Sequence, residues 1–209
     1  MPIYKNINGI RKKAKLAIMN NTFIPKIYYG DKLVYQSDGT VFESNVPGEY
    51  TVVIPAPAYY NITLVGGGGG GAFARYNYTR SSHTGGSASL VTGNVYVQSG
   101  TYTVFVGGGG NGASVVDTSA NAYGTDGGDS SFFGQTAGGG KGAWAGANYT
   151  TARGDNGNGG TATITESLSY TDGVKGDTTG VYRDGIGAGG GAGSKGNDGY
   201  VKISFVSFN

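Results

Sequence analysis

The sequence contains no cysteine, one histidine (His83), five prolines and few charges, with 15 Lys or Arg and 13 Asp or Glu among 209 residues. The lack of cysteine excludes a disulfide framework and thiolate metal sites, and a single histidine excludes a multi-histidine metal centre. No apolar run approaches the ~18 residues of a membrane-spanning helix, so we expect no membrane insertion. The apolar stretch after the first basic cluster is too short for a secretory signal peptide. We expect no cofactor.

What the chain has in excess is glycine, with 43 residues, or roughly three times ordinary usage. Between residues 66 and 199 lie 39 of them, with runs at Gly66–Gly71, Gly107–Gly110, Gly138–Gly140 and Gly189–Gly191. The glycines lack a strict period of three and the prolines are few, which excludes collagen. A flexible linker would be poor in aromatic residues, whereas this chain has 16 Tyr and 8 Phe. We therefore expect these glycines to lie in a packed structure.

Polyglycine loses much backbone entropy on folding, so it needs a packing arrangement that no other residue allows. Extended left-handed helices of the polyproline II type have three residues per turn and rise about 3.1 Å per residue. Without Cβ atoms, such helices can lie side by side, and each N–H can donate a hydrogen bond to a neighbouring helix. We therefore predict a polyglycine-II core from which loops emerge.

Strand patterns flank the glycine-rich segment. Residues 49–54 and 59–65 are two predicted strands, and in the second Tyr60, Ile62 and Leu64 share one face. Alternation returns near the end of the chain, from Tyr200 to Phe205, which indicates a closing strand. The predicted fold class is all-β and irregular, with almost no α-helix.

The predicted domains are a basic β-hairpin region at residues 1–37 and a β-flanked polyglycine-II domain at residues 38–209. Residues 1–37 contain seven Lys or Arg and one acid. Residues 27–35 indicate a hairpin turning at Gly30, and the alternation of Ala14, Leu16 and Ile18 indicates a half-buried strand. The basic cluster is either a solvated edge that resists aggregation or a docking surface for an acidic partner. We expect no nucleic-acid binding, because most aromatic residues lie elsewhere. The candidate attachment residues are Arg11, Lys12, Lys13, Lys15, Lys26 and Lys32.

Catalytic and nucleotide-binding motifs are weak. Gly-x-Gly-x-x-Gly occurs three times, but this glycine content produces it by chance and no helix is predicted to follow. His83 follows two serines, yet a hydrolase triad is defined by geometry, so we interpret His83 as a polar contact residue. Most aspartates stand beside Gly, Ser or Thr, which is typical of turns, with a calcium site near Asp126 and Asp129 or near Asp155 as an alternative. We expect a protein that is not an enzyme.

The segments between glycine runs are rich in Tyr, Ser and Asn with occasional Trp and Arg, a composition like that of antibody binding loops. Aromatic side chains give rigid contact area and suit stacking on sugar faces, while Ser and Asn give adaptable hydrogen bonds. The alternative is that the tyrosines cover the flanks of the glycine core. The candidate receptor-binding residues are Phe73, Arg75, Tyr76, Tyr78, Arg80, His83, Tyr123, Trp144, Tyr149, Arg153, Tyr170, Tyr182 and Arg183.

The sequence resembles a known family over about residues 48–206. The stretch Gly48-Glu-Tyr-Thr-Val-Val-Ile-Pro, followed by Asn61-Ile-Thr-Leu-Val and six glycines, is similar to the opening of the glycine-rich domain common in bacteriophage tail proteins. The closing Gly199-Tyr-Val-Lys-Ile-Ser-Phe fits as well. The polyglycine-rich tip adhesins of T-even-like phage tail fibres share this alternation of glycine runs with variable loops. The hairpin at residues 26–36 also resembles an element frequent in phage and prophage tail proteins.

The resemblance implies a tail-fibre or virion protein in a particle released by lysis, whose loops bind a host-surface protein or glycan. Its N-terminal region would attach to other virion subunits, with the protein either a homotrimer or a monomer capping a fibre. The main alternative is a purely structural virion or decoration protein. That alternative predicts that Tyr76, Tyr78 and Trp144 are buried against the core or a neighbouring subunit, whereas an adhesin predicts their exposure together at one end. An ice-binding row at residues 161–165 and a glycan depolymerase are further alternatives.

Overall fold

The computed structural model describes residues 39–165, 168–180 and 182–208, together with the backbone of six strands between residues 4 and 36. These strands form three antiparallel pairs: β1 (Tyr4–Ile7) with β2 (Ile10–Lys13), β3 (Ala17–Met19) with β4 (Thr22–Ile24), and β5 (Lys26–Tyr29) with β6 (Lys32–Gln36). The last pair confirms the hairpin predicted from residues 27–35. Its turn, the pattern at Ala14 and Leu16, and the side chains of the six attachment candidates lie outside the described part of the chain.

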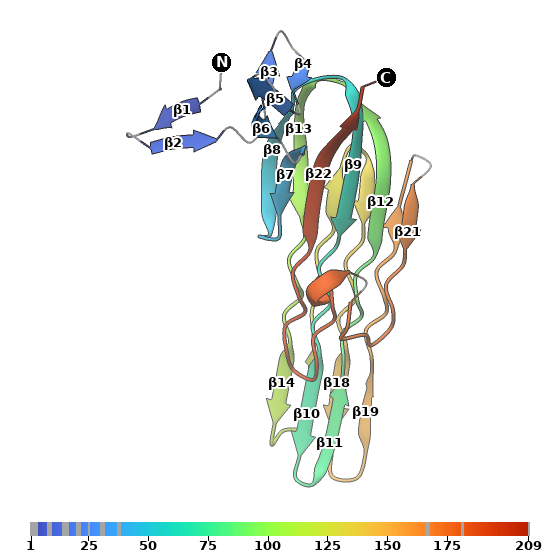
Figure 1. Ribbon diagram of the computed structural model, residues 1–209. Helices are drawn as coiled ribbons and strands as arrows, with labels where there is room; N and C mark the ends of the chain where they lie inside the picture. Colours follow the sequence, from blue (N-terminus) through green and yellow to red (C-terminus); the bar gives the residue numbers. More distant parts are fainter. Residues whose placement is uncertain are drawn as a thin grey trace.

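One end of the molecule is a sandwich of two five-stranded antiparallel sheets (Figure 1), called the sandwich below. The first sheet has the order β21-β12-β9-β22-β7 and the second β20-β17-β16-β13-β8. Their strands are β7 (Thr40–Ser44), β8 (Gly48–Ile54), β9 (Ala58–Val65), β12 (Leu90–Val97), β13 (Gly100–Val106), β16 (Ser130–Phe132), β17 (Gln135–Ala137), β20 (Ala162–Thr163), β21 (Ser169–Thr171) and β22 (Tyr200–Ser207). The strands predicted before and after the glycine-rich segment are therefore confirmed as β8, β9 and β22.

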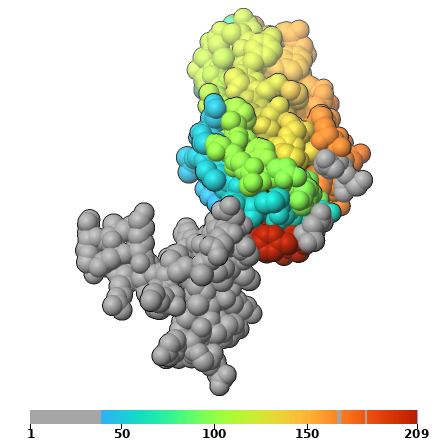
Figure 2. Space-filling view, turned by 90° about the horizontal axis from the view of Figure 1, so that it is seen from above, coloured from blue at the N-terminus to red at the C-terminus, as the bar shows by residue number. Residues whose placement is uncertain are grey.

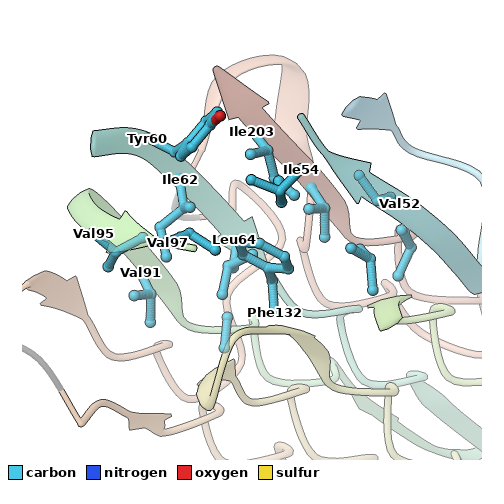
Figure 3. Packing of buried hydrophobic residues seen from close by; sticks show 14 of the residues in the cluster. Val52, Ile54, Tyr60, Ile62, Leu64, Val91, Val95, Val97, Phe132 and Ile203 are labelled. Carbon is cyan, nitrogen blue, oxygen red and sulfur yellow. The ribbon is translucent and has the colours of Figure 1, made fainter. Parts of the chain in front are cut away.

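The sandwich holds the main apolar core (Figure 3). Tyr60, Ile62 and Leu64 alternate along β9 and are at most 1% exposed, so the shared face predicted for them is confirmed. Side chains of the second sheet, such as Ile54 and Phe132, pack against them. Burying each large apolar side chain contributes about 1.5–3 kcal/mol, so this cluster is the main hydrophobic anchor of the fold.

The opposite end, called the tip below, is a smaller pair of three-stranded sheets with the orders β11-β10-β14 and β15-β18-β19. Its strands are β10 (Ala72–Tyr76), β11 (Thr79–His83), β14 (Ala113–Val116), β15 (Asn121–Tyr123), β18 (Trp144–Ala147) and β19 (Ala152–Asp155). Its core consists almost wholly of alanine: Ala72, Ala74, Ala122, Ala143, Ala145 and Ala147 are buried together. Tyr76 and Val115 pack against this core from its margin, and other large side chains on these strands, such as Phe73 and Trp144, are directed away from it.

Between sandwich and tip the chain passes repeatedly through extended glycine-rich segments, which together form the glycine core (Figure 1). Gly66–Gly71 lies inside it. Its N–H groups bond to a different neighbour at each step and return to the same neighbour every third residue: residues 125–128 accept from Gly67 and Gly70, residues 194–197 from Gly68 and Gly71, and residues 86–89 from Gly66 and Gly69. Three further segments donate to its carbonyls, through residues 140–143, residues 110–113 and Gly190.

This threefold repeat confirms the polyglycine-II prediction. A pleated strand bonds with a period of two and an α-helix bonds within itself, whereas a three-residue turn presents successive amides in three directions. Residues 85–89 follow the same rule, because Gly85 and Ala88 donate to residues 187–190 while Gly86 and Ser89 donate to residues 138–141. The glycine core is thus held by backbone hydrogen bonds running in several directions across its section.

Aspartates complete the hydrogen bonding at the boundary of the glycine core. Asp126 and Asp129, three residues apart, each accept a 2.8 Å bond, from the N–H groups of Gly142 and Gly139. Asp198 accepts from the Gly109 N–H at 2.8 Å. The expectation that these aspartates bond to nearby backbone in turns is wrong for all three, because their carboxylates accept from N–H groups of other segments. Asp126 and Asp129 do so at the three-residue spacing of the glycine core.

The alternative of a calcium site finds no ligand group here. Asp126 also accepts a bond from the Lys141 ammonium at 3.1 Å, and Asp155 pairs with Lys175 at 2.8 Å. Across the residues that the structure describes, no three His, Asp or Glu side chains gather in a metal-binding arrangement.

The described ends of the chain lie at the sandwich. Phe205 donates its N–H to the Gly39 carbonyl at 2.8 Å. Seen from this end, Figure 2 shows the red C-terminal residues at the surface, where Val206 and Phe208 are more than two-fifths exposed. Within the described ranges the only helical turn is η1 (Arg183–Gly185), and none of their helices is long and apolar enough to cross a membrane.

Candidate functional site

Ten of the thirteen candidate receptor-binding residues come together at the tip. β10 and the hairpin that follows it place Phe73, Arg75, Tyr76, Tyr78, Arg80 and His83, β15 places Tyr123, and β18 with its hairpin places Trp144, Tyr149 and Arg153. These residues lie far apart in the sequence, and the passes of the chain through the glycine core bring them to one end (Figure 1).

Alternation along the tip strands decides which side chains face outward. In β10, Ala72 and Ala74 are buried in the alanine core, so Phe73 and Arg75 lie on the opposite face and are only half-buried. β18 follows the same rule, with Ala145 buried and Trp144 half-buried. Alanine therefore fills most of the tip core and leaves Phe73, Arg75 and Trp144 for contact, whereas Tyr76 lies on the face of Ala72 and Ala74 and packs against the core.

Two tyrosines from separate hairpins meet at the far end of the tip. The Tyr76 and Tyr149 rings are 4.7 Å apart, edge to face at 87°, and Thr79 Oγ1 donates to the Tyr149 carbonyl at 3.2 Å. The neighbouring Tyr149 hydroxyl raises the pKa of Tyr76, while the polar groups of Tyr76 and Asn77 lower the pKa of Tyr149. Tyr149 nevertheless keeps 72% of its surface exposed.

Tyr78 is the most prominent side chain of the tip. It follows Asn77, whose φ of 51° is in the left-handed region that Asn tolerates better than most residues. This geometry closes the β10–β11 hairpin, and the Tyr78 side chain is fully exposed at its end. A fully exposed aromatic ring is a ready contact for a partner.

A second aromatic pair lies on the outer face of the β15-β18-β19 sheet. Tyr123 and Trp144 are cross-strand partners with ring centroids 6.4 Å apart and planes tilted by 22°. Asn121 Nδ2 donates to the Tyr123 hydroxyl at 3.1 Å, and Tyr123 is 62% exposed. The two rings form a flat platform beside Arg153, which is on a neighbouring strand.

A groove of about 350 Å³ separates the edge strands β11 and β19. Its lining residues are Arg80, Ser81, Ser82, His83, Ala152, Arg153 and Gly154. On its floor the Ser81 hydroxyl donates to the Arg153 carbonyl at 2.6 Å, and His83 Nε2 lies 3.1 Å from Ser81 Oγ. Because the serine proton is committed to the carbonyl, the imidazole donates to Ser81 Oγ and does not activate it. The Ser–His pair joins the two sheets.

Three candidates lie away from the tip. Tyr170 is on β21, at the edge of the sandwich. Tyr182 stacks on Tyr200 at 5.5 Å, and the Arg183 guanidinium lies 5.5 and 5.7 Å from the centres of these two rings. The half-buried Tyr182 thus covers the flank of the glycine core, which is the alternative role considered for the tyrosines.

A carboxylate joins this cluster to the sandwich. Glu43 accepts a 2.6 Å bond from the Tyr200 hydroxyl and lies 3.7 Å from Arg183. Burial and the neighbouring Glu43 charge raise the pKa of Tyr200, and the bond from Tyr200 lowers the pKa of Glu43. We interpret these contacts as structural.

Two exposed residues of the tip were missed by the sequence reasoning. Val116 on β14 is 47% exposed, and Asn121 positions the Tyr123 hydroxyl. The signal for Val116 was present, because Val115 packs on the alanine core and the next residue must face the other way. Asn121 gave no signal, because its role depends on a neighbour that the fold selects.

Comparison with known families agrees with this architecture. Residues 44–204 match the family model described as a glycine-rich domain, and this range includes the glycine core, the tip and nearly all of the sandwich. No curated protein matches the sequence.

Proposed function

The chain belongs to the glycine-rich domain family, and on this premise we propose that it is a phage tail-fibre or virion protein whose tip binds a receptor on the host surface. The observation that carries the proposal is the gathering of ten candidate contact residues at the end of the molecule opposite Gly39 and Phe205. In the proposal, residues 1–37 attach the protein to other virion subunits and the tip projects outward. The phage assignment rests on the sequence resemblance described above.

The construction of the tip supports a binding role. The glycine core gives a rigid base, and the alanine core of the tip directs large side chains outward. Tyrosine on a rigid base offers amphipathic contact area at a low entropy cost, as in antibody binding sites. Tyr78, Tyr123 and Tyr149 are each more than three-fifths exposed, on three separate turns or strands.

The alternative of a purely structural virion protein predicts that Tyr76, Tyr78 and Trp144 are buried against the core or against a neighbouring subunit. Tyr78 is fully exposed, and Tyr76 and Trp144 are half-buried beside more exposed partners. This pattern opposes burial of Tyr78 on the chain's own core, while a receptor and a neighbouring subunit could both use exposed rings, so whole-cell binding is the measurement that separates the two roles.

The test is whole-cell binding by the purified protein across a panel of bacteria. The variant replaces the three exposed tyrosines, Tyr78, Tyr123 and Tyr149, by serine, because these side chains contribute little to the alanine core. The control replaces Tyr59 and Phe105 of the sandwich by serine, since both are exposed and both are distant from the tip.

We expect strain-selective binding by the wild-type protein and the control, and at least a tenfold loss for the tip variant with unchanged circular dichroism. Because contact aromatics commonly carry more than 1 kcal/mol each, three of them suffice for this loss. Binding to no strain, or equal binding by the folded tip variant, would reject the tip as a receptor-binding surface and favour the structural alternative.

A further inference from the structure

The groove between β11 and β19 is lined by two arginines that have no ion-pair partner in the described structure, a feature that the receptor-binding proposal does not require. Most Lys and Arg side chains that the structure describes are held in ion pairs: Arg75 with Asp117, Lys141 with Asp126, Lys175 with Asp155, Arg183 and Lys202 with Glu43, and Lys195 with Asp198. Among the described side chains, the two cations without such a partner are Arg80 and Arg153, and both line this one groove.

The fold places these two arginines along one groove. Arg80 comes from β11 and Arg153 from β19, which are edge strands of different sheets. The register puts each arginine on the face of its sheet that is turned away from the alanine core, so the two stand at the two outer rims of the groove. The 2.6 Å bond from Ser81 to the Arg153 carbonyl fixes the two strands against each other. His83, bonded to Ser81, adds a third nitrogen-bearing side chain to the floor.

No acid in the described part of the groove lining offsets these charges. The nearest carboxylate along β19 is Asp155, which is held by Lys175 at 2.8 Å. Guanidinium groups bind carboxylate and phosphate through paired, parallel hydrogen bonds, and an uncompensated pair of them attracts an anion. We propose that this groove binds an anionic group, a carboxylate or a phosphate, carried by a glycan of the host surface. This inference rests on the proposed function of the tip.

The lining favours a glycan over an acidic protein loop. Five of its seven residues are Arg, Ser or His, and the other two are Ala152 and Gly154. Protein interfaces have a centre depleted in charge, whereas two of the seven residues of this groove are arginines. The Tyr123–Trp144 platform lies on the same sheet as Arg153 and offers flat ring faces on which sugar rings can stack.

The experiment measures binding of the full-length protein to four probes by isothermal titration calorimetry. The probes are oligogalacturonate for the carboxylate, a phosphate-bearing oligomannan for the phosphate, neutral dextran oligosaccharide, and an oligoglutamate peptide. The variants are Arg80→Gln, Arg153→Gln, the double variant, and Arg153→Lys. Lys202→Gln in the sandwich removes the same charge away from the tip and serves as the control.

We expect one anionic oligosaccharide to bind, dextran not to bind, and each Arg→Gln change to weaken affinity by about tenfold or more. Arg153→Lys should recover only part of the affinity, because an ammonium keeps the charge and loses the paired geometry. Lys202→Gln should bind as the wild type does. The arginine variants should keep the wild-type unfolding midpoint, because neither Arg80 nor Arg153 has an ion-pair partner in the described structure.

Three results would overturn the inference: equal binding of dextran, unchanged binding by the double variant, or tighter arginine-dependent binding of oligoglutamate, which would assign the groove to an acidic protein loop. The cell panel separates this failure from failure of the proposed function. If the double variant binds cells as the wild type does, the glycan assignment is wrong and the receptor-binding tip stands. If the wild type binds no cells but binds an anionic oligosaccharide through both arginines, the groove assignment stands and the adhesin proposal is wrong.

Discussion

The glycine core makes a sharp prediction for Gly68→Ala. A Cβ atom added at Gly68 would lie 1.8 Å from the Ala188 carbonyl oxygen, whereas ordinary contact begins near 3.4 Å. The neighbouring segment must therefore retreat by about 1.6 Å. That carbonyl accepts the Asn197 N–H at 2.8 Å, and the Asn197 carbonyl accepts the Gly68 N–H at 2.8 Å. A retreat of Ala188 alone breaks the first bond, and a retreat of Ala188 together with Asn197 breaks the second, so one bond is lost in either case.

The energetic cost follows from the lost bond and from overpacking. A bond broken inside the structure costs about 1–3 kcal/mol, overpacking adds about 1–3 kcal/mol, and the lower entropy of unfolded alanine returns about 0.4–1 kcal/mol. The free energy of unfolding should fall by about 3 kcal/mol. For a chain of this size the midpoint temperature should drop by about 6–12 °C. Urea unfolding followed by far-UV circular dichroism measures the first quantity, and a thermal scan measures the second.

Gly191→Ala is the matched control. An added Cβ at Gly191 meets nothing within 4 Å, and its φ lies outside the left-handed region. We expect it to be neutral or more stable than the wild type by up to about 1 kcal/mol. Equal stabilities of Gly68→Ala and Gly191→Ala would refute the close backbone packing on which the fold description depends.

Three further predictions address the boundary of the glycine core, the flank and the tip. Burial opposes ionisation of Asp198, but hydrogen bonds from Gly109 and Lys195 prevail and lower its pKa. The contribution of Asp198 to stability is therefore complete above about pH 5 and is lost as the pH falls below 3.8. Asp198→Asn should reduce the slope of the unfolding free energy against pH in urea titrations from pH 2 to 6, and an unchanged slope would contradict this. Tyr200→Phe should cost about 1 kcal/mol by removing the 2.6 Å bond to Glu43 and should raise the Glu43 pKa, which carboxyl NMR measures against a wild-type titration. Ala145→Leu should overpack the alanine core and lower the stability of the tip by about 1–3 kcal/mol. The unfolding transition seen by fluorescence of Trp144, the single tryptophan, should then occur at lower urea than the transition seen by circular dichroism of the sandwich. Coincident transitions would show that tip and sandwich unfold together.

The strands and the type of glycine packing could be predicted from the sequence because both depend on local pattern. Tyr60, Ile62 and Leu64 alternate with less buried neighbours, and polyglycine has few ways of packing. The partners of Gly66–Gly71 could not be predicted, because consecutive identical residues carry no information on which neighbour each one bonds. The fold selects these partners through the strands at both ends of each segment.

The candidate site shows the same division. Composition was enough to select Tyr78 and Trp144, since large aromatic side chains between glycine runs have few other uses. It could not separate them from Tyr182, which stacks on Tyr200 against the glycine core. The placement of Arg80 and Arg153 along one groove depends on a contact between Ser81 and Arg153, which are 72 positions apart in the sequence, and no local pattern indicates it.

The direction of the glycine segments has a mechanical consequence. They run along the line that joins the tip to the sandwich, and their hydrogen bonds cross that line (Figure 1). A pulling force between the two ends therefore acts perpendicular to many backbone hydrogen bonds at the same time. These bonds share the load, so they would have to break together and not one after another. Because each segment is tied to others in several directions, the load spreads through the whole cross-section. A slender stalk built almost without side chains can in this way resist extension.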